Sequence, residues 1–225
     1  MAGRLRVWSS LGGVVFAVLA VIGAILLYDG PMGSSPAKMT AWYGSSSHRT
    51  QLNVGWVISA LALFFLVWFV GALREHVAAG ERASGDGSSF LSAIVTIGGS
   101  VFVAVALCQI GLADGIKSMS DDTYQHQVYS GVIHAAGDAS YMMLVSGGVA
   151  LATMIFAAAA AIFAFGFAPR WVGWFGVVAG VAAVFSLFFF TMILWLAWFA
   201  VASVAMFLRA RSTAPSAQPL PAHAG

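Results

Sequence analysis

The chain has 225 residues, of which 60% are hydrophobic and 8% are Asp, Glu, Lys or Arg. Soluble domains carry about 25% charged residues, so this composition excludes an ordinary water-soluble domain and indicates an integral membrane protein. The net charge of +2 gives no sign of a nucleic-acid partner. A single cysteine, Cys108, excludes an intrachain disulfide and a cysteine-ligated metal cluster, and we expect it to be a small residue of the apolar interior.

Six apolar segments are long enough to cross a bilayer, which takes about 20 residues in a helix. They are approximately Trp8–Leu27, Leu52–Leu73, Phe90–Leu112, Tyr141–Ala168, Trp171–Phe189 and Met192–Leu208. The first segment follows Arg4 and Arg6, as the apolar part of a signal peptide does. Its length and the lack of a small-residue cleavage site nevertheless predict an uncleaved helix.

The last two segments come from one charge-free run of 38 residues, between Arg170 and the pair Arg209 and Arg211. A single helix of that length would reach about 57 Å. The hydrocarbon core of a bilayer is only about 30 Å thick. We therefore predict that this run crosses the membrane, turns and crosses back, which makes six spans in total.

The distribution of lysine and arginine predicts the orientation, because cytoplasmic loops are enriched in both. With six spans, the side of the two termini holds seven of them and the other side three (Lys38, Arg49 and Lys117). We expect one all-α domain over residues 1–211, a six-transmembrane-helix bundle with cytoplasmic termini. Residues 212–225, rich in Ala, Pro and Ser, are predicted to be a disordered cytoplasmic tail.

The connections differ in character. The first outer connection, about residues 28–51, contains several glycines and prolines and is predicted to include a short helix near Met39–Tyr43. The inner stretch Glu81–Ser89 is rich in Gly and Ser and is predicted to be a flexible loop. His48 and His76 are expected in loops, exposed to solvent.

Small residues predict where helices approach one another, since apolar burial does not drive helix association in lipid. The third, fourth and fifth segments are expected to pack through such faces, within one chain or between two copies. The residues concerned are Gly98, Gly99, Gly147, Gly148, Gly176 and Gly180.

None of the six segments contains Asp, Glu, Lys, Arg or His. An ionisable residue inside the bilayer costs at least about 2.5–3.5 kcal/mol and is kept for function. This absence argues against proton-coupled transport, voltage sensing and acid–base chemistry within the membrane. It also leaves no pair of histidines for a haem between helices, and we expect no cofactor and no catalytic residue there.

His134 and Asp138 are the candidate exception, just before the fourth segment. If a helix begins near Val128, the two side chains are four residues apart on one face. Such a pair can bind a divalent metal with His126 or the pair Asp121 and Asp122 supplying a third ligand, act as a general base, or form a salt bridge that fixes the start of the helix. We favour the salt bridge over a metal or catalytic site.

Several stretches resemble a family of uncharacterised bacterial six-span integral membrane proteins of about 200 residues. They are Ala41-Trp42-Tyr43, Ala62–Arg74, Gly137-Asp138 and Pro169-Arg170-Trp171-Val172-Gly173-Trp174. The resemblance implies six spans in a bacterial cytoplasmic (inner) membrane and carries no catalytic residues. The last stretch also has a physical reading: proline suits the first turn of a helix, while Arg170, Trp171 and Trp174 anchor it at the inner interface.

The leading interpretation is a non-enzymatic accessory protein that interacts with membrane lipids or partner proteins, as a homo-oligomer or within a larger membrane complex. One alternative is a transporter or channel for a small neutral or apolar molecule. A water-filled cavity among the third to fifth segments, lined by Ser92, Thr96, Ser100 and Gln109, would favour it. The other is a membrane enzyme with an outer-surface site near His134 and Asp138.

Overall fold

The computed structural model describes residues 8–28, 35–85, 88–121 and 130–212, and every regular element among them is a helix. The predicted all-α class is therefore confirmed. The candidate ligand His126 and the predicted tail after Ser212 lie outside the described residues. The helices are α2 (Gly12–Tyr28), α3 (Pro36–Gly44), α4 (Ser46–Ser84), α5 (Phe90–Asp121), α6 (Ser130–Phe165), α7 (Arg170–Val184), the 3-10 helix η1 (Phe189–Thr191) and α8 (Met192–Ser212).

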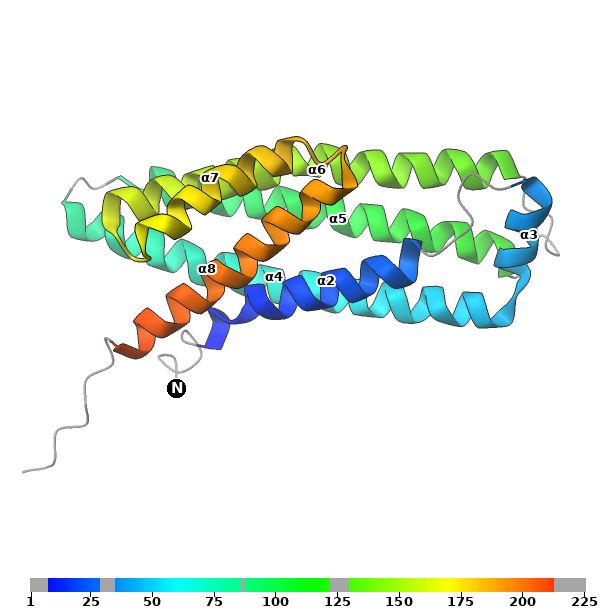
Figure 1. Ribbon diagram of the computed structural model, residues 1–225, viewed down its shortest axis with the longest axis horizontal. Coiled ribbons are helices and arrows are strands. Elements are labelled where there is room, and N and C mark those ends of the chain that lie inside the picture. Colours follow the sequence, from blue (N-terminus) through cyan, green and yellow to red (C-terminus); the bar gives the residue numbers. More distant parts are fainter. Residues whose placement is uncertain (1–7, 29–34, 86–87, 122–129, 213–225) are drawn as a thin grey trace, which may run out of the picture.

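The helices form two layers (Figure 1). The long helices α4, α5 and α6 lie side by side as the first layer, with α5 in contact with both neighbours. In the second layer α2 packs along α4 and α7 along α6, while α8 crosses obliquely and contacts both α2 and α7. The short helix α3, which the sequence predicted, lies across one end of the long helices.

Four helices, namely α4, α5, α6 and α8, are long and apolar enough to cross a membrane by length and composition. The other two apolar helices are shorter. Helix α2 has 17 residues and α7 has 15, which correspond to about 25 Å and about 22 Å. Helix α7 ends at Val184, before the predicted boundary at Phe189, because the chain begins to turn there.

The turn between α7 and α8 contains neither Gly nor Pro. Side-chain hydroxyl groups donate hydrogen bonds to backbone carbonyl oxygens in and beside this turn. Ser186 Oγ donates to Ala183 O at 2.6 Å, and Thr191 Oγ1 lies 2.7 Å from Phe188 O. Tyr141 of α6 donates its hydroxyl to Leu187 O at 2.6 Å. These bonds explain how an apolar run without ordinary turn residues folds back on itself.

The connection between α4 and α5 is shorter than predicted. Residues Glu81–Ser84, expected in a flexible loop, form the last turn of α4. The helix ends at Gly85, whose φ of 74° lies in the left-handed region that glycine adopts without strain. His76, also expected in a loop, lies within α4, where its Nδ1 is 2.8 Å from Ala72 O.

The end of the bundle that holds α3 is also more ordered than predicted. His48 lies in the first turn of α4 and stacks on Trp42 of α3, with ring centroids 4.5 Å apart. Burial raises the pKa of the Tyr43 phenol above its usual value, since the neutral form is favoured away from water. Cys108 was expected in the apolar interior, and this expectation was wrong, because the residue is exposed on the surface of α5.

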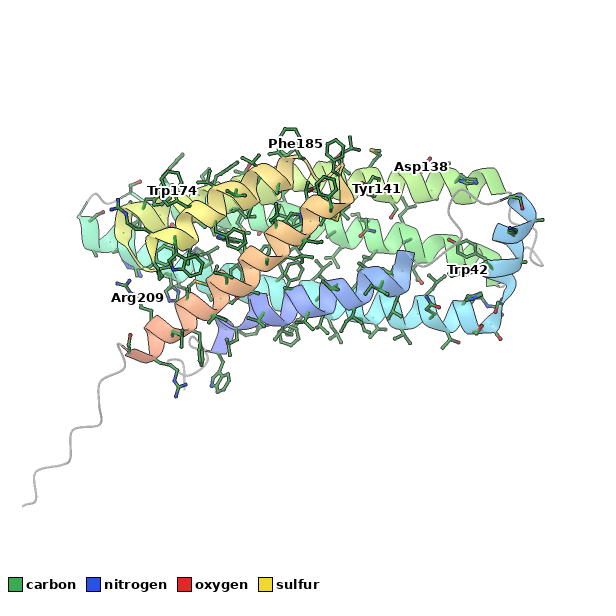
Figure 2. The ribbon with its side chains drawn as sticks, in the orientation of Figure 1. Trp42, Asp138, Tyr141, Trp174, Phe185 and Arg209 are labelled. Carbon is green, nitrogen blue, oxygen red and sulfur yellow. The ribbon has the colours of Figure 1, made fainter. Side chains whose placement is uncertain are left out.

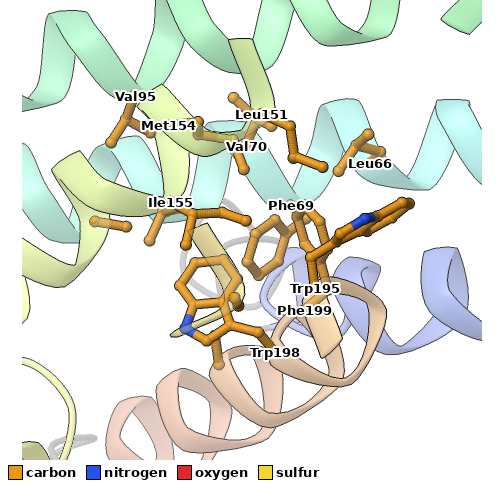
Figure 3. Close-up of a cluster of buried hydrophobic side chains, with 14 of the residues drawn as sticks. Leu66, Phe69, Val70, Val95, Leu151, Met154, Ile155, Trp195, Trp198 and Phe199 are labelled. Atoms are coloured by element: carbon orange, nitrogen blue, oxygen red, sulfur yellow. The ribbon is translucent and has the colours of Figure 1, made fainter. Parts of the chain in front are cut away.

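Large aromatic rings join α8 to the first layer (Figure 3). The ring centroid of Phe199 lies 5.2 Å from that of Phe69 on α4 and 5.0 Å from that of Phe16 on α2, both in edge-to-face geometry. The ring of Trp195 lies 6.0 Å from Phe102 on α5. Aromatic pairs of this kind contribute about 0.5–1.5 kcal/mol each beyond their burial.

The glycines singled out by the sequence lie in contacts within the chain. A Cβ on Gly98 would stand 2.7 Å from Ala150 O, and one on Gly148 would collide with the carbonyl oxygen of Ala183. The close approaches are therefore backbone to backbone, between α5 and α6 and between α6 and α7. The remaining four face side chains of neighbouring helices: Gly99 faces Val70, Gly147 faces Val105, Gly176 faces Trp198 and Gly180 faces Phe156.

We expect Gly148→Ala to lower the free energy of unfolding by about 1–3 kcal/mol, because the obstructing atom is a backbone carbonyl that cannot rotate away. Gly71→Ala on α4 is the matched control, since nothing lies within 4 Å of its Cβ position. This control should be neutral or up to about 1 kcal/mol more stable, as alanine favours helix. Thermal unfolding in one detergent measures both variants, and equal shifts would contradict the proposed close approach.

Candidate functional site

Helices α2 and α8 are in close contact at one end of the bundle only. The ring of Trp8, just before α2, lies 6.0 Å from Phe207, and Phe16 packs against Phe199. Beyond Phe16 the two helices diverge toward the end of the bundle where α3 lies (Figure 1). The divergence leaves a space whose floor is formed by the long helices.

This space is a cavity of about 520 Å³, walled by residues of α2, α4, α5, α6 and α8. Its volume lies within the range of small-molecule sites, about 300–1,000 Å³. The wall is predominantly apolar. Its edge includes Val21 and Ile25 of α2 and Ile193 of α8, which are 45%, 64% and 66% exposed on the outside of the bundle. The cavity therefore adjoins an apolar outer surface.

Three side chains with polar atoms contribute to the wall, namely Ser59, Gln109 and Trp195. Ser59 of α4 faces Gly23 of α2, whose missing side chain leaves room for the hydroxyl. Gln109 is 4% exposed and donates Nε2–H to Ser140 Oγ at 3.1 Å, while Ser140 Oγ lies 3.2 Å from Gln109 O. This paired contact ties α5 to α6 beside the cavity and satisfies part of a buried amide.

A cavity lined by Ser92, Thr96, Ser100 and Gln109 would favour the transporter alternative. Of its four expected residues, Gln109 alone lines the cavity described above. Ser92 and Thr96 bond to carbonyl oxygens of their own helix region, Ser89 O at 3.0 Å and Ser92 O at 2.7 Å. Ser100 is exposed. A shared helical face does not tell whether that face meets a neighbouring helix, lipid or a cavity.

His134 and Asp138 lie in the first turns of α6, and both side chains are exposed. Figure 2 shows Asp138 beyond Tyr141, toward the end of α6 near α3. Within the ranges that the structure describes, no hydrogen bond or ion pair joins the two residues, so the favoured salt bridge is not formed there. The same ranges contain no group of three His, Cys, Asp or Glu side chains placed to hold a metal. The metal site stays the less favoured alternative, because His126 lies outside the described residues.

The predicted interface anchors gather at the opposite end. Trp171 and Trp174 in the first turn of α7 are 59% and 66% exposed, and Arg170 beside them is exposed as well. Arg209 of α8 donates to Gly166 O, between α6 and α7. Figure 2 shows Trp174 and Arg209 far from Trp42, which lies at the α3 end.

A buried carboxylate that was not singled out from the sequence lies at the same end of the bundle. Glu81, in the last turn of α4, is 5% exposed. Its Oε1 accepts hydrogen bonds from Leu91 N at 2.7 Å and Ser92 N at 3.2 Å, in the first turn of α5. The carboxylate thus caps the N-terminus of the next helix, where backbone N–H groups lack partners and negative charge is favourable. Capping by Glu81 was not predicted, because the stretch Glu81–Ser89 is rich in Gly and Ser, a composition typical of a flexible loop.

Compared with known proteins, the chain matches no family model, no curated protein and no solved structure. The family resemblance drawn from the sequence therefore stays a prediction.

We expect Glu81→Ala to lower the free energy of unfolding by about 1–2 kcal/mol, the usual effect of losing a helix cap. Glu81→Gln keeps an acceptor oxygen and should lose less than half as much. Glu75→Ala is the control, because this carboxylate is 39% exposed and only pairs with Arg74 at 3.0 Å. Thermal unfolding in detergent gives the ranking. A capping role is excluded if Glu81→Ala shifts the midpoint no more than Glu75→Ala does.

Proposed function

We propose that this chain is a six-span protein of a bacterial cytoplasmic membrane that binds the acyl chain of a membrane lipid in the cavity between α2 and α8. In this proposal it acts as a non-enzymatic, lipid-interacting component. The observation that carries the proposal is the apolar cavity that adjoins the exposed apolar surface of α2 and α8.

The six-span topology is supported by the arrangement of the two short apolar helices. Helix α2 runs along α4 and α7 runs along α6, so each has a long partner that exceeds the thickness of a bilayer. The exposed Trp171, Trp174 and Arg170 form an end that suits a membrane–water interface. The excess of arginine on that side favours the cytoplasm.

The choice of a lipid chain follows from what surrounds the cavity in that topology. Val21, Ile25 and Ile193 would face the hydrocarbon, so lipid chains are the molecules present at highest concentration beside the cavity. Water is unsuited to a wall with so few polar groups. Because lipid chains are as apolar as leucine side chains, affinity for one of them must come from packing and from the few polar groups in the wall.

Replacing Ala24 of the cavity wall by Phe should block the cavity with a phenyl ring. We expect the wild-type chain to keep bound lipid through purification in a mild detergent. The affinity of Ala24→Phe for lipid should be at least about tenfold lower. Native mass spectrometry of the purified protein measures the bound fraction. Ala104→Phe is the matched control, since Ala104 is exposed on α5 and lies outside the wall.

The control variant should retain lipid like the wild-type chain. Equal lipid retention in Ala24→Phe and the wild-type chain would overturn the proposal, as would a wild-type chain that binds no lipid. Displacement of lipid by dimerisation would show instead that a second copy occupies the cavity.

The orientation is tested by cysteine labelling in intact cells. In a Cys108→Ala background, Ser47→Cys at the start of α4 should react with a membrane-impermeant maleimide. Ser212→Cys at the end of α8 should react only after the membrane is opened. The reverse pattern, or labelling of both residues from outside, would exclude the proposed topology.

The same cavity favours a second candidate, a transporter for a small neutral or apolar molecule. Its volume of about 520 Å³ and the buried amide of Gln109 suit such a ligand. Transport requires access from both sides of the membrane, and binding of a lipid chain requires access from the side only. Uptake of an apolar dye into proteoliposomes, blocked by Ala24→Phe, would favour the transporter. The enzyme alternative near His134 and Asp138 has gained no support from the geometry.

A further inference from the structure

The two ends of the cavity are closed by different kinds of side chain. Three aromatic rings line one end, those of Phe16 on α2, Phe102 on α5 and Trp195 on α8, and each of these residues is at most 5% exposed. The other end, toward the C-terminus of α2 and the N-terminus of α8, is lined by aliphatic side chains such as Leu27 and Met192. Flexible aliphatic side chains adapt to a ligand, whereas rings packed in a core adapt far less. The aromatic end is therefore the rigid one.

The ring of Phe16 is held in place by two others. It stacks on Trp195 with centroids 6.5 Å and planes 18° apart, and Phe102 packs edge-on against the same indole at 6.0 Å. Phe199, which does not line the cavity, contacts Phe16 edge-to-face at 5.0 Å. Figure 3 shows Trp195 and Phe199 close together within the buried cluster. Phe16 cannot turn aside without displacing one of these rings, so it forms a fixed wall at the end of the cavity.

The exposed edge of the cavity lies away from the aromatic end. Along α2, Val21 and Ile25 of this edge lie about 7.5 Å and about 13.5 Å beyond Phe16. On α8 the edge residue is Ile193, in the first turn of the helix. The polar head of a lipid stays outside an apolar wall, because burying it without partners is costly. A lipid chain that enters through this edge therefore points its methyl end toward Phe16.

The length of the cavity corresponds to an acyl chain of one leaflet. Its wall on α2 extends from Phe16 to Leu27, a distance of about 16 Å along the helix. Its wall on α5 extends from Phe102 to Ile110, about 12 Å. The acyl chains of one leaflet fill half of the hydrocarbon core, about 15 Å.

From these observations we propose that the ligand is an acyl chain of limited length, which lies along α2 with its methyl end against the ring of Phe16. The inference rests on the proposed function and adds the chain-length specificity of the cavity. Phe16 is the residue that determines it, because a longer chain must bend or leave part of its length outside. One methylene too many in an apolar pocket lowers affinity by about tenfold where the wall is closed. Two sources offer such a chain, a glycerolipid and a free fatty acid.

The test measures how affinity depends on chain length, by native mass spectrometry of the delipidated full chain. The probes are diacyl lipids with one head group and saturated chains that increase by two carbons at a time. For the wild-type chain we expect affinity to fall by at least about threefold per step beyond an optimal length. Phe16→Leu removes the ring and should move the optimum to longer chains. Ratios of variant to wild-type affinity cancel the different solubilities of the lipids.

Ala20→Leu is the opposite change. Ala20 lies one turn beyond Phe16 on α2 and lines the cavity, so a leucine there brings the wall closer and should move the optimum to shorter chains. Phe69→Leu is the matched control. Phe69 is fully buried and packs on Phe199 at 5.2 Å, but it does not line the cavity, and its variant should keep the wild-type optimum. If Phe16→Leu does not fold, Ala20→Leu decides the question.

Free fatty acids of the same lengths form the second arm. An optimum that the two cavity variants move in opposite directions with diacyl lipids assigns the chain to a glycerolipid. The same pattern with fatty acids alone assigns it to a free acid.

The outcomes separate the two proposals. If the wild-type chain binds neither kind of probe, the proposed function fails. If it binds them without an optimal length, or with one that neither cavity variant moves, lipid binding stands and the role of Phe16 is overturned. An optimum that Phe69→Leu moves as far as Phe16→Leu does would overturn it as well.

Discussion

The packing of α8 across three long helices is the constraint on which the rest of the structure depends. A helix that crosses obliquely cannot keep its backbone close to α4, α5 and α6 at once. Large rings fill the distance, with Phe199 and Trp198 against Phe69 of α4 and Trp195 against Phe102 of α5. Elsewhere in the bundle small residues bring the backbones together, as Gly98 and Gly148 do. The molecule therefore combines a close-packed side and a side spaced by aromatic rings.

The cavity is a direct result of that spacing. Where α2 joins α8, Phe16 completes the aromatic cluster and the interior is filled. Where α2 and α8 diverge, the wall residues are smaller, for example Ala20, Ala24 and Ala106, and space remains. The same helix thus closes the bundle at one end and leaves it accessible at the other. This geometry leaves a predominantly apolar space beside the aromatic cluster.

Segment length and composition were enough to predict the helices, the all-α class and the short helix α3, because hydrocarbon allows few other backbone structures. The ends of the helices were predicted less well. The polar residues before Leu52 and after Leu73 were assigned to connections, although they continue α4 for several turns. An apolar run marks the part of a helix that suits a bilayer, and it does not show where the helix itself begins and ends. The cavity could not be predicted, since its position depends on a crossing angle between helices. The role of Glu81 depends on a contact across the α4–α5 connection.

The shortness of α7 has a consequence for the surrounding bilayer. Its 15 residues reach about 22 Å, whereas the apolar part of the neighbouring long helices is long enough to cross a full hydrocarbon core. In the proposed topology the turn that follows α7, with Phe185, Leu187 and Phe188 exposed, lies below the outer surface. Lipids on that flank must tilt or the membrane must thin locally, at a fraction of a kcal/mol per Å of hydrophobic mismatch. The protein would then prefer thin patches of membrane, and it would deform thicker ones asymmetrically, most strongly on the side of α7, the shorter of the two short helices.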